Sequence, residues 1–124
     1  MKLIIGGAYQ GKLTYAVKKY SLDSKDIFDF AGGYPEGQYA CYTHFEQLTR
    51  RAALSRQPFG NFIDDFPGMA FNSIVISREI GCGVVPMDAD ERFWREYHGM
   101  ALSALARNAE SVTRIFCGIP EVLK

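Results

Sequence analysis

Short apolar segments alternate with amphipathic segments along this chain of 124 residues. Apolar runs, rich in β-branched side chains, occupy 2–5, 73–77 and 113–117 and have the length of buried parallel strands. Weaker strand patterns occupy 27–30 and 38–42. These five segments predict a sheet that is buried on both faces.

Three other segments carry apolar residues at spacings of three and four, which predicts helices over about 12–21, 43–56 and 88–107. Two of these helices start with the sequence pattern of a capping box. Thr43 precedes Glu46 by three residues, and Asp88 precedes Glu91 by three. We therefore expect Thr43 and Asp88 to be the N-caps of their helices.

The intervening segments contain turn residues. Gly32 to Gly37 and Arg78 to Pro86 are predicted loops, and the aromatic-rich stretch from Phe59 to Phe71 predicts a short helix followed by a turn at Pro67-Gly68. Asp64-Asp65 is expected to be a solvated acidic turn. Because strands alternate with helices, we predict a single α/β domain over 1–124 with a mostly parallel sheet.

Composition limits the classes of partner. Fourteen Lys and Arg residues balance fourteen Asp and Glu residues, so the formal net charge is zero. Proteins that bind nucleic acids generally, or that bind anionic membranes by charge, carry an excess of basic residues. This chain has no such excess, so neither a nucleic acid nor a membrane is expected as a partner. The 48% hydrophobic and 23% charged residues are ordinary for a folded soluble domain.

The cysteines and the N-terminus favour a cytoplasmic protein. Cys41, Cys82 and Cys117 are odd in number and widely spaced, which argues against a disulfide framework or a zinc cluster. The apolar start is too short for a signal peptide, and no segment has the uninterrupted apolar length of a transmembrane helix.

The candidate chemistry lies directly after the first predicted strand. Gly6, four residues, Gly11 and Lys12 have the spacing of a phosphate-binding P-loop between a strand and a helix. Glycines allow the backbone N–H groups to approach an anion, and the lysine ammonium would reach the β- and γ-phosphates. The predicted nucleotide-binding residues are Gly6, Gly7, Ala8, Tyr9, Gln10, Gly11, Lys12, Leu13 and Thr14. The alternative is a glycine-rich turn with a solvated lysine.

One position departs from the motif. A P-loop lysine is normally followed by Ser or Thr, whose hydroxyl binds Mg²⁺. Here Leu13 follows Lys12, and the hydroxyl comes one residue later on Thr14, about 100° further round the helix. Mg²⁺ therefore stays a candidate cofactor with no assigned protein ligand.

Two segments together resemble the adenosylcobinamide kinase / adenosylcobinamide-phosphate guanylyltransferase family. One is the start of the chain, Leu3-Ile4-Ile5-Gly6-Gly7-Ala8-Tyr9-Gln10-Gly11-Lys12. The other runs Ile74-Val75-Ile76-Ser77-Arg78-Glu79-Ile80-Gly81-Cys82-Gly83-Val84-Val85-Pro86, where that family has a strand followed by Asn-Glu-Val-Gly-x-Gly-Ile-Val-Pro. The helix with Arg92 and Arg95 and the end from Arg114 to Lys124 fit as well.

The resemblance implies a small three-layer, P-loop NTPase-like α/β domain, which in that family is often oligomeric. It implies binding of ATP or GTP, phosphorylation of a corrinoid hydroxyl in cobalamin assembly, and a matching acidic residue at Glu79. Lys12 and Glu79 are therefore the predicted catalytic residues, with a nucleotide and a corrinoid as partners.

The middle of the chain is shorter than in that family, which carries its guanylylated histidine there. His44 and His98 lie outside the corresponding segment, so both are interpreted as structural or surface residues, and guanylyl transfer is not expected. No clear apolar strand before residue 70 ends in Asp. These departures leave an alternative, a non-catalytic subunit that binds a nucleotide or corrinoid or serves in assembly.

Overall fold

The structure is a computed structural model that describes residues 1–80 and 87–124. The elements are, in chain order, β1 (Lys2–Gly6), α1 (Lys12–Tyr20), η1 (Ser24–Asp26), β2 (Ile27–Asp29), η2 (Phe30–Gly32), β3 (Cys41–Thr43), α2 (Phe45–Leu54), α3 (Phe59–Met69), β4 (Ile74–Arg78), α4 (Ala89–Asn108), β5 (Ser111–Phe116) and β6 (Ile119–Val122). No helix among the described residues is both long and apolar enough to cross a bilayer.

Within these residues the strands form one sheet in the order β2-β3-β4-β1-β5-β6. All neighbours are parallel except β5 and β6, which form an antiparallel hairpin. The mostly parallel α/β fold is therefore confirmed. Because β1 lies between β4 and β5, the chain crosses from one side of β1 to the other through α4, which creates a topological switch point at the carboxyl end of β1.

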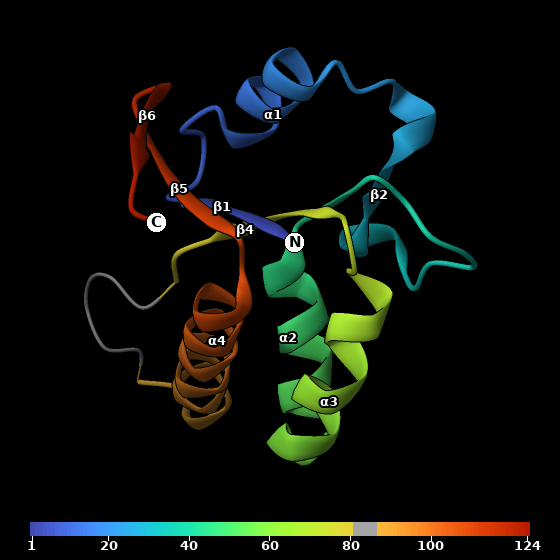
Figure 1. Cartoon of the computed structure of the whole chain (residues 1–124). Coiled ribbons are helices and arrows are strands. Elements are labelled where there is room, and N and C mark those ends of the chain that lie inside the picture. The colour runs from blue at the N-terminus through green and yellow to red at the C-terminus, as the bar shows by residue number, and fades with distance from the viewer. Residues whose placement is uncertain (81–86) are drawn as a thin grey trace.

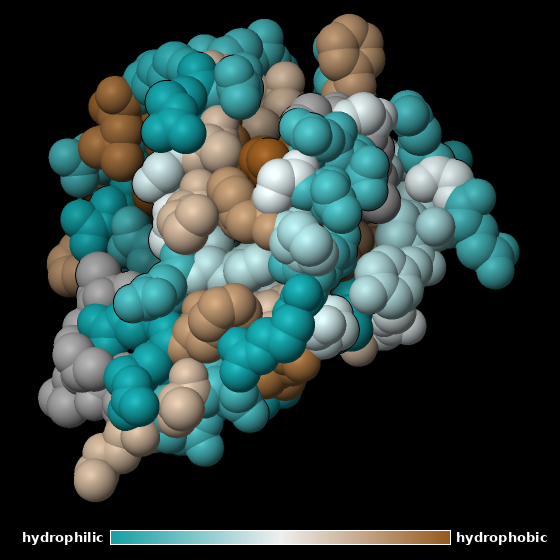
Figure 2. All heavy atoms as spheres, turned by 90° about the horizontal axis from the view of Figure 1, so that it is seen from below, coloured by the Kyte–Doolittle hydropathy of each residue, from teal (hydrophilic) through white to brown (hydrophobic). Residues whose placement is uncertain are grey.

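Helices cover both faces of the sheet, which gives three layers (Figure 1). Helix α1 lies on one face, and α2, α3 and α4 lie on the other. The larger apolar core lies on the side of α2 to α4 and includes Leu3, Tyr42, Phe45 and Leu105. The smaller core, beneath α1, contains Ile4, Ala16 and Ile76. On the side of the molecule seen in Figure 2, hydrophilic and hydrophobic side chains are interspersed.

The predicted capping box at the start of α2 is wrong. His44, not Thr43, is the N-cap; its φ is 58°, and its side chain makes no cap hydrogen bond. Glu46 is buried instead of reaching back to the helix end. The other capping box is confirmed in part, because Asp88 accepts hydrogen bonds from the backbone N–H groups of Asp90 and Glu91.

Three further differences concern the middle and the end of the chain. Helix α3 continues through Pro67 and Gly68, so Asp64 and Asp65 lie on its exposed side and not in a turn. Strand β2, although only three residues long, does end in an aspartate, Asp29. The sequence pattern predicts a turn at Gly118-Ile119-Pro120 and a short apolar end at Val122-Leu123, but the chain forms β6 there. The residues of β6 are all exposed and therefore lack the apolar signal of a buried strand.

Candidate functional site

The loop between β1 and α1 adopts a tight, glycine-dependent conformation. A Cβ atom on Gly6 would lie 2.6 Å from the carbonyl oxygen of Ile115 on the neighbouring strand β5, so the close packing of β1 and β5 requires glycine there. Gly11 has a φ of 86° and is the N-cap of α1. Tyr9 also has a positive φ, and its side chain is fully exposed. This backbone brings the start of α1 to the end of β1, as a phosphate-binding loop requires.

Two hydrogen bonds connect this loop to the turn between β5 and β6. The side-chain oxygen of Gln10 accepts from the backbone N–H of Cys117 at 2.5 Å, and the Gln10 carbonyl accepts from the N–H of Gly118 at 2.9 Å. The loop that resembles a P-loop is thus connected to the C-terminal segment of the chain.

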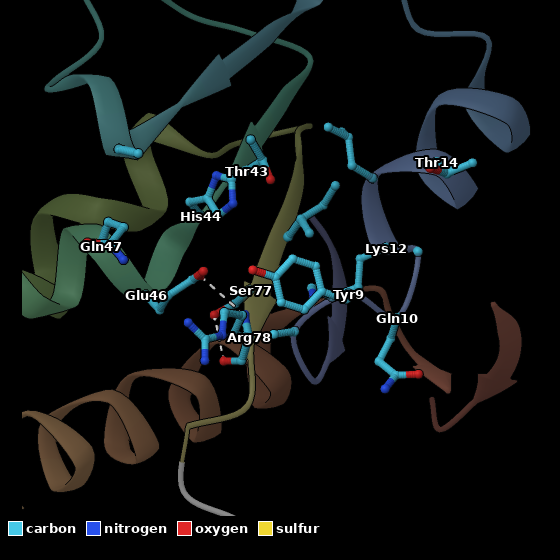
Figure 3. Close-up of a pocket in the computed structure, with 15 residues that line it drawn as sticks. Tyr9, Gln10, Lys12, Thr14, Thr43, His44, Glu46, Gln47, Ser77 and Arg78 are labelled. Carbon is cyan, nitrogen blue, oxygen red and sulfur yellow. Dashed lines mark hydrogen bonds between the residues drawn. The ribbon is translucent and has the colours of Figure 1, made fainter. Parts of the chain in front are cut away.

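A cavity of about 420 Å³ opens beside the loop at the carboxyl edge of the sheet (Figure 3). That size lies within the range of small-molecule sites. It is lined by Ala8, Tyr9, Gln10, Gly11, Lys12, Leu13, Thr14, Ala31, Thr43, His44, Glu46, Gln47, Ile76, Ser77 and Arg78. Seven of the nine predicted nucleotide-binding residues, Ala8 to Thr14, therefore line one cavity, while Gly6 and Gly7 form the backbone leading into it.

Lys12 and Arg78 place two cationic side chains at this cavity. Gly6 and Arg78 are register partners on the adjacent strands β1 and β4, which explains why Arg78 lies beside the loop. Lys12 Nζ donates a hydrogen bond of 2.6 Å to the Gly7 carbonyl. Burial lowers the pKa of the Lys12 ammonium; the negative charge of Glu46 opposes this shift, and Arg78 adds to it. Two neighbouring cations suit a polyanionic ligand.

Glu46 is a buried carboxylate among these groups. Its residue is 1% exposed, and its Oε2 accepts a hydrogen bond of 3.2 Å from the backbone N–H of Arg78. Among residues 1–80 and 87–124, no group forms a hydrogen bond with its Oε1. A buried charge is costly unless it is compensated, and the nearby charge of Lys12 supplies part of that compensation. The negative charge of Glu46 therefore stabilises the positive charge of Lys12 at the cavity.

His44 also lines the cavity and forms a hydrogen bond with Asp29. Its Nδ1 lies 2.8 Å from Asp29 Oδ1, and both side chains are about half exposed, at 47% and 49%. The parallel register of β2 and β3 places Asp29 beside Thr43, the residue before His44. Figure 3 shows the imidazole projecting from the start of α2 toward the space in front of Tyr9 and Lys12.

Sequence reasoning missed three residues that line the cavity, His44, Glu46 and Arg78, and it missed Asp29, which contacts His44. The signal for His44 and Asp29 was their position at the ends of two short strands, because the carboxyl ends of parallel strands share one edge of the sheet. For Glu46 the only signal, its spacing from Thr43, suggested a helix cap. His98, interpreted as a structural or surface residue, is buried between Thr49 and the Arg78 carbonyl.

Glu79 lies apart from the cavity. Its carboxylate approaches Arg114 Nε at 3.5 Å and lines a separate hollow against α4, although its backbone N–H donates to the Gly6 carbonyl. Glu79 is therefore not among the residues that line the cavity, although its negative charge acts to raise the pKa of Lys12. The rest of the predicted second signature, Gly81 to Pro86, lies outside the described residues.

The described side chains fit a protein-held metal ion poorly. Leu13 offers no oxygen after Lys12, and Figure 3 shows the Thr14 side chain turned away from Glu46 and Arg78. Over residues 1–80 and 87–124, no group of three or more His, Cys, Asp or Glu side chains is arranged to hold a metal.

A comparison with protein-family models gives a match to cobinamide kinase / cobinamide phosphate guanyltransferase over residues 41–123. The matched region includes β3, α2, β4 and the C-terminal hairpin, and it begins after the loop at 6–12. A search of individual curated proteins gives no match. Because the matched region is about two-thirds of the chain and the sheet has the expected α/β topology, the chain belongs to the cobinamide kinase / cobinamide phosphate guanyltransferase family.

Proposed function

We propose that this protein binds ATP or GTP at the loop formed by residues 6–12 and transfers the γ-phosphoryl group to the hydroxyl of a corrinoid. The family acts as a kinase and guanyltransferase on cobinamide and its phosphate, in cobalamin biosynthesis. The observation that carries the proposal is that Lys12 and Arg78 both line one cavity at the carboxyl end of β1.

The site would act chiefly by positioning and by charge stabilisation. In phosphoryl transfer, negative charge is spread over the γ-phosphoryl oxygens, and cationic side chains with backbone N–H groups stabilise it. On binding, the Lys12 ammonium would exchange its hydrogen bond with the Gly7 carbonyl for phosphate oxygens. Burial lowers the Lys12 pKa, and the negative charge of Glu46 would oppose that lowering.

Transfer of radiolabelled γ-phosphate from ATP or GTP to adenosylcobinamide tests the proposal. We expect phosphorylation by the wild-type protein and a loss of at least about tenfold in Lys12→Ala, because one charge-assisted contact to phosphate contributes roughly 1.5–3 kcal/mol. Lys25→Ala, on the exposed turn η1, is the matched control and keeps the wild-type rate. Saturable nucleotide binding without any transfer would instead support the non-catalytic alternative.

A further inference from the structure

The backbone of His44 is held in a conformation that few side chains adopt. Its φ is 58°, in the left-handed region that favours glycine. The residue lies where β3 ends and α2 begins, and its side chain does not cap the helix. Such local strain persists where the surrounding structure requires it and occurs often at functional sites. Here it directs an imidazole into the cavity beside Lys12.

Asp29 fixes the orientation of that imidazole. The carboxylate oxygen Oδ1 of Asp29 lies 2.8 Å from His44 Nδ1 and also accepts a hydrogen bond of 2.8 Å from the Ala31 N–H, which anchors the carboxylate itself. An ionised carboxylate only accepts hydrogen bonds, so His44 Nδ1 carries the proton. In the neutral imidazole, Nε2 then has a free lone pair. A histidine held in one tautomer by a carboxylate is the arrangement of a general base.

The other carboxylate at the cavity is poorly placed for this role. The Glu46 side chain is buried, including its Oε1, which accepts no hydrogen bond among the described residues, whereas about half of the His44 side chain is exposed. Among the described residues that line the cavity, the imidazole of His44 and the carboxylate of Glu46 are the candidate proton acceptors. His44 is therefore the proton acceptor that a bound hydroxyl compound can reach.

We infer that His44, oriented by Asp29, is the general base for phosphoryl transfer to an alcohol; this inference rests on the proposed function. The hydroxyl oxygen of the acceptor forms a bond to the γ-phosphorus, and the bond from that phosphorus to the β,γ-bridging oxygen breaks. The nucleoside diphosphate leaves with the electron pair. The hydroxyl proton moves to His44 Nε2, and the resulting imidazolium, stabilised by Asp29, later releases it to water.

His44→Gly is the variant that tests the base, because glycine accepts a φ of 58° without strain and the fold should not suffer. We expect nucleotide affinity by calorimetry to stay within about twofold and kcat to fall by at least about 100-fold, the range of general-base catalysis. Added imidazole should restore part of the lost rate. Asn72→Gly is the matched control, since Asn72 is exposed and has a φ of 59°; its kcat stays at the wild-type value.

Asp29→Asn tests what the Asp29 carboxylate contributes to the action of His44 while leaving the imidazole in place. Asparagine keeps an oxygen that can accept from the Ala31 N–H but no longer stabilises the imidazolium, so kcat should fall while nucleotide affinity stays unchanged.

Three results would overturn the inference: full kcat in His44→Gly, a loss in that variant confined to nucleotide affinity, or a stable phosphoryl or nucleotidyl adduct on His44 by intact-mass measurement. A wild-type protein that binds no nucleotide would contradict the proposed function instead.

Discussion

The side-chain oxygen of Gln10 accepts a hydrogen bond from the backbone N–H of Cys117, although the two residues are 107 positions apart. Gln10 belongs to the loop after β1, and Cys117 lies in the turn of the β5–β6 hairpin. A second hydrogen bond, from the Gly118 N–H to the Gln10 carbonyl, runs beside the first. The β5–β6 hairpin therefore helps to fix the conformation of the loop at residues 6–12.

Gln10→Ala should loosen this connection. Removing one partly exposed hydrogen bond lowers the free energy of unfolding by about 0.5–1 kcal/mol, and a less ordered loop binds nucleotide a few-fold more weakly. Urea unfolding and nucleotide calorimetry measure the two effects. Gln38→Ala, in an exposed loop, controls for the loss of the amide. Equal nucleotide affinity in Gln10→Ala and the wild type would show that the connection does not shape the loop.

Gly6→Ala should be destabilising. Its new Cβ would lie 2.6 Å from the Ile115 carbonyl oxygen, and backbone atoms on both strands must move apart to relieve that overlap. We expect a loss of roughly 1–3 kcal/mol in the free energy of unfolding.

Gly99→Ala is the matched comparison for this substitution. Gly99 is exposed within α4, and a Cβ there meets no atom within 4 Å. Because alanine is the better helix former, this variant should gain about 1 kcal/mol. The substitution of glycine by alanine is thus predicted to lower the free energy of unfolding at position 6 and to raise it at position 99. Thermal or urea unfolding of the two variants measures both changes. If Gly6→Ala leaves the free energy of unfolding unchanged, β1 and β5 do not pack closely enough to require glycine at position 6.

His98 should make stability depend on pH. Burial lowers the pKa of His98, although the Arg78 carbonyl and the charge of Glu46 oppose the shift. As pH falls through the unfolded value of about 6.5 toward the lower folded value, the unfolded chain takes up a proton that the folded protein does not. The contribution of His98 to stability is therefore complete above that window and decreases within it.

His98→Gln tests this contribution. Glutamine can still donate a hydrogen bond to the Arg78 carbonyl but does not titrate, so the decrease in unfolding free energy between about pH 7.5 and pH 5.5 should become smaller. Urea unfolding of both proteins at several pH values measures it. If the free energy of unfolding depends on pH in the same way in the wild type and in His98→Gln, groups other than His98 cause that dependence.

The sheet could be predicted from the sequence because burial on both faces leaves a strong apolar signal in β1, β4 and β5. The loop at 6–12 could be predicted because its spacing is local. The sequence did not predict β6, whose residues are exposed and include Pro120. Its pairing depends on β5 and not on its own hydrophobicity, so only the tertiary structure reveals it.

The predicted site was incomplete for a related reason. Thr43 and Glu46 have the spacing of a capping box, but Glu46 instead accepts a hydrogen bond from the Arg78 N–H, 32 residues away. His44 and Asp29 meet because β2 and β3 are paired in parallel, a relationship that neither short strand displays in its own sequence. Local patterns thus predict the loop and Lys12 as site residues, whereas the other groups at the cavity come together only through long-range strand pairing.

Calorimetric titration with ATP and with GTP, in the presence of Mg²⁺, tests the central claim most directly. Saturable binding of at least one nucleotide to the wild-type protein is predicted. Binding should weaken by at least about tenfold in Lys12→Ala and stay unchanged in Lys25→Ala, because a charge-assisted contact to phosphate contributes roughly 1.5–3 kcal/mol. No saturable heat with either nucleotide, or the same affinity in Lys12→Ala as in the wild type, would contradict the account.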